Sequence, residues 1–157
     1  MAIRNIIEYS DPSLRRKSRP VEKFDARMRE LLDDLAETMY ASEGVGLAAP
    51  QVGVLRRAIV VDALDGLGLL VCVNPRLISA EGEQDGPEGC LSIPGRQGYV
   101  VRPQRVTVAY QDREGNEQTV TAEGYRARAL CHEMDHLDGQ LFIDIMHDEI
   151  EVDEDGE

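Results

Sequence analysis

The chain has 157 residues, of which 42% are hydrophobic and 30% are charged. This is the composition of one globular domain, and it excludes a largely disordered chain. The formal net charge of -13 at pH 7 would repel a phosphate backbone, so we expect no direct binding to nucleic acid.

The N-terminal segment has no apolar stretch of the length that a signal peptide or a membrane span requires. We therefore expect a cytoplasmic protein without a membrane partner. The chain has 3 cysteines, Cys72, Cys90 and Cys131. In a reducing compartment such thiols are more often buried, metal-bound or catalytic than paired, and no disulfide is expected.

The first predicted element is an amphipathic helix over residues 25–42. Its apolar side chains recur at a helical period, and Asp25 is suited to cap the first turn. The next two elements are short runs at 58–62 and 69–74, which are apolar, β-branched and bounded by Gly, Asp or Pro. These features are typical of buried strands.

The second half of the chain predicts a hairpin followed by a helix. Residues 105–110 and 118–122 alternate apolar and polar side chains, and turn-forming residues separate them. After Gly124 the pattern becomes helical to about Leu137, and residues 141–145 are expected to be extended.

The order of a helix, several strands and a second helix favours a single α+β domain with small antiparallel or mixed sheets. We place this domain at residues 1–146. The remaining segment, 147–157, holds seven acidic residues and no Lys or Arg. We expect this segment to be a solvated, frayed tail.

The last predicted helix contains the sequence His-Glu-Met-Asp-His at residues 132–136, a match to the H-E-x-x-H pattern. Residues four apart on a helix project to the same side, so both imidazoles can reach one metal ion while Glu133 reaches a water. The apolar stripe of this helix lies roughly opposite the two histidines. A metal site therefore requires another segment to cover them.

Two upstream segments are suited to cover this face. Residues 44–51 are rich in small side chains and end in the amide of Gln51. Residues 88–92 place Cys90 among turn-forming residues. Taken alone, the first is also compatible with an ordinary loop, and a lone cysteine is more often a small buried hydrophobic residue.

Together, the segments 44–51, 88–92 and 132–137 resemble the three signature motifs of the peptide deformylase family. The resemblance covers nearly all of the chain outside the acidic tail. It implies a divalent metal ion held by Cys90, His132 and His136, with Glu133 transferring the proton. Such ligands suit iron, zinc, nickel or cobalt, and the resemblance implies Fe2+ as the native ion.

The resemblance also implies a substrate, the formyl-methionyl end of a newly synthesised polypeptide, and formate as a product. The side-chain amide of Gln51 and the backbone N–H of Leu91 would then meet the formyl oxygen. The peptide would bind as an added strand along Val45, Gly46 and Gly89. The methionine pocket would draw on Val45, Tyr125, Ala129 and His132.

Some features leave the interpretation open. Cys131 stands where the family usually has Gln, while Tyr125 and Gly86 stand where other members often have larger aliphatic residues. Glu88 and Arg102 are candidates for supporting the metal ligands, although a solvated pair would be the commoner outcome. The substrate suggests transient association with the ribosome, and a monomer is the default because no coiled-coil pattern is present.

Two rival functions remain at this stage. A zinc peptidase with the same helix motif commonly takes a third Glu or His ligand downstream, where the only histidine is His147. A structural zinc site would need a fourth protein ligand, which Cys72 or Cys131 would have to supply.

Overall fold

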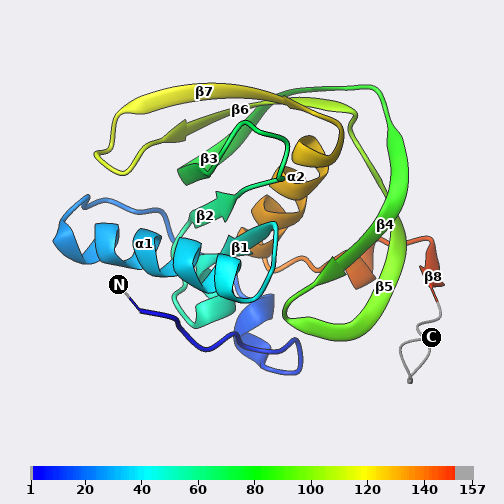
Figure 1. Cartoon of the computed structure of the whole chain (residues 1–157), viewed down its shortest axis with the longest axis horizontal. Helices are drawn as coiled ribbons and strands as arrows, with labels where there is room; N and C mark the ends of the chain where they lie inside the picture. The colour runs from blue at the N-terminus through cyan, green and yellow to red at the C-terminus, as the bar shows by residue number, and fades with distance from the viewer. Residues whose placement is uncertain (1, 151–157) are drawn as a thin grey trace.

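The computed structural model describes residues 2–150. In this part of the chain, two α-helices, α1 (Ala26–Ala41) and α2 (Gly124–Leu137), pack on a five-stranded antiparallel sheet (Figure 1). The sheet has the order β1-β2-β3-β6-β7. Its strands are β1 (Gly46–Ala48), β2 (Ala58–Val61), β3 (Leu70–Glu81), β6 (Arg105–Gln111) and β7 (Glu117–Glu123).

The alternation of side chains along β2 explains why the two helices lie on opposite faces of this sheet. Ile59 and Val61 belong to the core cluster that contains the apolar side of α2. Ala58 and Val60 belong to the cluster that contains the apolar side of α1. Because successive side chains of a strand point to opposite faces, one short strand supplies both cores and all four residues are fully buried.

A second sheet has three strands in the order β4-β5-β8. The strands β4 (Gln84–Cys90) and β5 (Ile93–Arg102) form a hairpin, and β8 (Asp148–Ile150) pairs with β5. In Figure 1 the long strands β4 and β5 curve along the side of the molecule next to α2. Three short 3-10 helices complete the described part, η1 (Pro12–Arg15), η2 (Ala49–Val52) and η3 (Phe142–Asp144).

The predicted α+β class is confirmed, as are both helices and the hairpin of β6 and β7. Asp25 caps α1 as predicted, since its carboxylate accepts a hydrogen bond of 3.0 Å from the backbone N–H of Met28. No helix in residues 2–150 combines the length and apolar character that a bilayer crossing requires.

Several boundaries differ from the prediction. The strand predicted at 69–74 continues to Glu81. The segment 44–51, for which an ordinary loop was an alternative, contains β1 and the first three residues of η2. The segment 141–145 is not extended, because Phe142 turns inward and η3 packs on the second sheet. The first residues of the expected acidic tail form β8, while residues 151–157 lie outside the described part of the chain.

Candidate metal centre

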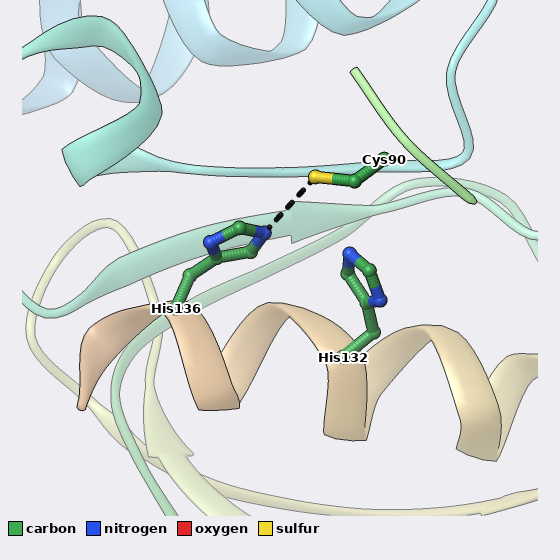
Figure 2. A group of neighbouring side chains, drawn as sticks. All are labelled: Cys90, His132 and His136. Carbon is green, nitrogen blue, oxygen red and sulfur yellow. Dashed lines mark hydrogen bonds between the residues drawn. The ribbon is translucent and has the colours of Figure 1, made fainter. Parts of the chain in front are cut away.

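Cys90, at the end of β4, lies opposite two histidines of α2. The ligand atoms of Cys90, His132 and His136 all lie within 4.8 Å of one another, and Cys90 Sγ is 3.3 Å from His136 Nε2. Figure 2 shows both imidazoles projecting from the same side of α2 towards the sulfur. The histidine side of the helix is covered, since His132 is 7% exposed and His136 is 1% exposed.

The donor atoms of this cluster suit a divalent metal ion. One thiolate and two imidazoles are common ligands of zinc and related ions, and three protein ligands leave a tetrahedral position open. Burial lowers the pKa of His136 well below its usual value, so its ring is neutral, as a metal ligand must be. Within residues 2–150 no fourth His, Cys, Asp or Glu joins the group, so the arrangement resembles a catalytic site more than a closed structural one.

His132 is held by a buried carboxylate on the neighbouring hairpin. Its Nδ1 lies 2.8 Å from Glu88 Oε1, and Glu88 accepts two further hydrogen bonds of 2.8 and 2.9 Å from Arg102. Burial alone would raise the pKa of Glu88, but the hydrogen bonds from Arg102 and His132 outweigh it and lower the pKa to about 2. A carboxylate at this position favours a proton on Nδ1 of His132, so Nε2 is the nitrogen that would bind an ion.

Glu88 and Arg102 are therefore buried and paired, which excludes the solvated arrangement that is commoner for such residues. Two further members of this network were missed by the sequence analysis. Arg128 donates to Glu88 at 2.7 Å, and Asp135 accepts from Arg102 at 2.6 Å. Arg128 could have been predicted from the sequence. It lies four residues before His132 and therefore on the same side of α2.

Glu133 lies in the same site without being part of the ligand group. Its side chain is buried, and Oε1 has no hydrogen-bond partner among the described residues. Burial raises the pKa of Glu133 to about 7, a value suited to a group that must both take up and release a proton near neutral pH. A Cβ placed on Gly46 would lie 2.8 Å from Glu133 Cγ, so only glycine leaves room for this carboxylate beneath β1.

The amide of Gln51 is fixed at the other side of the sulfur. Its Oε1 accepts a hydrogen bond of 2.9 Å from the backbone N–H of Ala48, which orients the NH2 group. Nε2 then donates to Ser92 Oγ at 3.0 Å and lies 3.5 Å from Cys90 Sγ. The side chain of Gln51 is 1% exposed, so this orientation is set by the protein and not by solvent.

A cleft of about 380 Å³ opens over the cluster. It brings together every residue predicted for the site except His136, which lies beneath it. The predicted residues that line it are Val45, Gly46, Gln51, Gly89, Cys90, Leu91, Tyr125, Ala129, His132 and Glu133. The rival ligand sources are not part of the cluster. Cys72 is in the core under α2, His147 contacts Asp85 and Asp148, and Cys131 is outside the ligand group.

Comparison with known proteins assigns the chain to a family. The sequence model of the polypeptide deformylase family matches residues 3–151. The peptide deformylase of Caldanaerobacter subterraneus is 56% identical over 144 residues, which cover 92% of this chain and 89% of that protein. The peptide deformylase of Symbiobacterium thermophilum is 52% identical over 158 residues, which cover 100% of this chain and 73% of that protein.

Solved structures agree with the sequence comparisons. The crystal structure of a peptide deformylase from Legionella pneumophila superposes with a TM-score of 0.88 at 46% identity, covering 92% of this chain and 86% of that one. The peptide deformylase from Thermotoga maritima gives a TM-score of 0.88 at 39% identity, covering 92% of this chain and 97% of that one. Since these matches span nearly all of the described residues, the chain belongs to the peptide deformylase family.

Proposed function

We propose that this protein removes the N-formyl group from the N-terminal formyl-methionine of newly synthesised polypeptides and releases formate. The observation that carries the proposal is the cluster of Cys90, His132 and His136, with the buried Glu133 beside it at the floor of a cleft. Membership of the peptide deformylase family supports the same reaction.

We infer that the three ligands hold Fe2+ natively, and that Zn2+, Ni2+ or Co2+ can take its place in a purified sample. Imidazole and thiolate donors suit all four ions, so the choice depends on supply as well as affinity. When bound, the ion supplies a Lewis acid that lowers the pKa of a water molecule and favours negative charge on a carbonyl oxygen.

Glu133 is proposed to transfer the proton. Its buried carboxylate would accept a proton from the attacking water and pass it to the departing amine of the substrate. The pKa of about 7 supports this role, because the group can exist in both protonation states near neutral pH. The lack of a hydrogen-bond partner for Oε1 among the described residues leaves that oxygen available.

Gln51 and Leu91 are proposed to stabilise the charge that develops on the formyl oxygen. The Gln51 NH2 group is pinned through Ala48 and Ser92, so it needs little reorganisation when the charge forms. The second donor would be the backbone N–H of Leu91, directly after Cys90 at the rim of the cleft.

The peptide part of the substrate is proposed to bind as an added strand. β1 is at the edge of the five-stranded sheet, and only one of its sides pairs with another strand, β2. The open side can therefore bond to an extended peptide through backbone groups near Val45 and Gly46, with Gly89 on the opposite wall. Tyr125 and Ala129 would then contact the methionine side chain.

The proposed substrate also bears on location and partners. Because the proposed substrate is the N-terminus of a newly synthesised polypeptide, we infer a cytoplasmic enzyme that associates with ribosomes transiently. We infer a monomer by default, because the sequence has no coiled-coil pattern and the site draws its residues from one chain.

The direct test is formate release from a formyl-methionyl peptide by the purified, metal-loaded protein. We expect formate in proportion to bound metal, loss of activity after chelation, and recovery when Fe2+ or Ni2+ is restored. The same peptide without the formyl group should stay intact. Cleavage of its internal peptide bonds would instead support a zinc peptidase.

A second test uses the close approach of β1 to Glu133. Gly46→Ala should push the carboxylate away from its position, because the added methyl group overlaps it. A displacement of about 1 Å can cost roughly 100-fold in rate, so we expect a loss of about 10- to 100-fold in kcat. The measurement is formate release at equal metal content, with thermal unfolding as a check on folding. Unchanged kcat would show that the position of Glu133 is not critical.

A further inference from the structure

Arg128 is a buried cation that the proposed reaction does not use. Its side chain projects from α2 towards the β4–β5 hairpin, and the residue is only 4% exposed. The guanidinium donates to Glu88 Oε2 at 2.7 Å and to the backbone carbonyl of Val100 at 2.9 Å. Longer hydrogen bonds of 3.3 and 3.4 Å reach the carbonyls of Gly86 and Gln84. A cation with this many partners is fixed in one place.

Gly86 leaves the space that this guanidinium occupies. A Cβ built on Gly86 would lie 3.2 Å from Arg128 Nη2, which is tighter than most Cβ contacts, and 3.5 Å from Cζ, which is an ordinary contact distance. The guanidinium has little freedom to move away, because its hydrogen bonds hold it against β4 and β5. The backbone of Gly86 is outside the left-handed region, so its lack of a side chain is explained by this contact and not by conformation.

The two residues lie one behind the other at the wall of the cleft. Arg128 lines the cleft next to Ala129 and Tyr125, whereas Gly86 does not line it. The guanidinium therefore stands between the cleft and Gly86. The same guanidinium holds Glu88, and Glu88 holds His132, so one side chain touches both the pocket wall and the support of a metal ligand.

We infer that Arg128 and Gly86 form a matched pair that closes the far end of the pocket for the first side chain of the substrate and holds Glu88 against His132. This inference rests on the proposed function, because it concerns the methionine side chain of the proposed substrate. Arg128 is a positioning and specificity residue, since it acts through the shape of the pocket and through Glu88.

The pocket end is tested with peptides that differ by one methylene group, formyl-methionyl and formyl-ethionyl. Arg128→Met keeps an apolar stem but removes the guanidinium, which opens the space over Gly86. Since one methylene in an apolar pocket is worth about 10- to 200-fold in discrimination, we expect the preference for methionine over ethionine in kcat/KM to fall about tenfold. Arg126→Met is the matched control, because Arg126 is buried on the same helix but contacts Asp65 and Gly68 outside the cleft.

The matching of the pair is tested by a double-mutant cycle. Gly86→Ala alone should displace the guanidinium and lower kcat/KM about tenfold, whereas in the Arg128→Met background it should change kcat/KM by less than about twofold. The thermal unfolding midpoint should show the same non-additivity, and this readout does not depend on catalysis. The unfolding midpoint therefore tests the pairing of Arg128 and Gly86 separately from the proposed function. If the proposed function is wrong, the wild type will release no formate.

Two results would overturn the inference. If Arg128→Met leaves the kcat/KM ratio of the formyl-methionyl and formyl-ethionyl peptides unchanged, Arg128 only links α2 to the hairpin and does not shape the pocket. Additive effects of Gly86→Ala and Arg128→Met on both kcat/KM and the unfolding midpoint would show that the residues are not a pair. Gly86→Ala changes a half-buried strand position, so it provides a folded variant even if Arg128→Met does not fold.

Discussion

Replacing Cys90 with serine is expected to remove most of the bound metal and, with it, formate release. The thiolate is the strongest donor of the three proposed ligands, and a serine hydroxyl is a much poorer one. Loss of a residue that only supports a ligand typically costs about 10- to 100-fold in metal affinity, so loss of a ligand should cost more than about 100-fold. Elemental analysis after dialysis measures the metal, and formate release measures the activity.

Cys131→Ser is the matched control for this change. Cys131 is half-buried and directly precedes His132, but it is not part of the ligand group. This variant should keep the ion and most of the activity. Loss of the ion in Cys131→Ser as well would indicate a closed structural site with four protein ligands. Retention of both metal and activity in Cys90→Ser would remove Cys90 from the ligand set.

The elements that could be predicted are those in which the buried face shows as a regular pattern in the element's own residues. The apolar stripe of α1 and the alternation of β6 and β7 each reflect one buried face, so the pattern of residues 25–42 and 105–122 was sufficient. The hairpin of β4 and β5 was missed because β4, with the sequence QDGPEGC, contains no β-branched residue. It is held in place by pairing with β5 and by buried arginines, which no local pattern reveals.

The site residues also fall into those that the local sequence predicts and those that only the fold brings together. His132, Glu133 and His136 follow from the geometry of one helix, and the structure covers that side of α2 as a metal site requires. The contribution of Cys90 came from resemblance, because Cys90 lies 42 positions before His132 in the sequence and only the fold brings them together. The cluster around Glu88 joins β4, β5 and α2, so the sequence offered Glu88 and Arg102 only as candidate supports, with a solvated pair as the commoner alternative.

Glu133→Gln is expected to stop turnover while leaving the metal in place. Glutamine has nearly the same shape as glutamate, so the contact with Gly46 and the packing of α2 should persist, but its amide cannot accept the proton of the attacking water. Glu133 is outside the ligand group, so the ion should remain with Cys90, His132 and His136. A positioned general base or acid contributes about two to four powers of ten, and we expect kcat to fall by that amount.

The measurement is formate release per bound metal, comparing wild type and Glu133→Gln at equal occupancy. Glu37→Gln is the control, because Glu37 is a half-buried helical glutamate whose Oε2 also has no partner among the described residues, yet it lies on α1 outside the cleft. Its turnover should match the wild type. Near-normal turnover in Glu133→Gln would assign the proton transfer to another group. Loss of the ion would make Glu133 a ligand or a support for one, because a residue that only transfers protons leaves metal affinity unchanged.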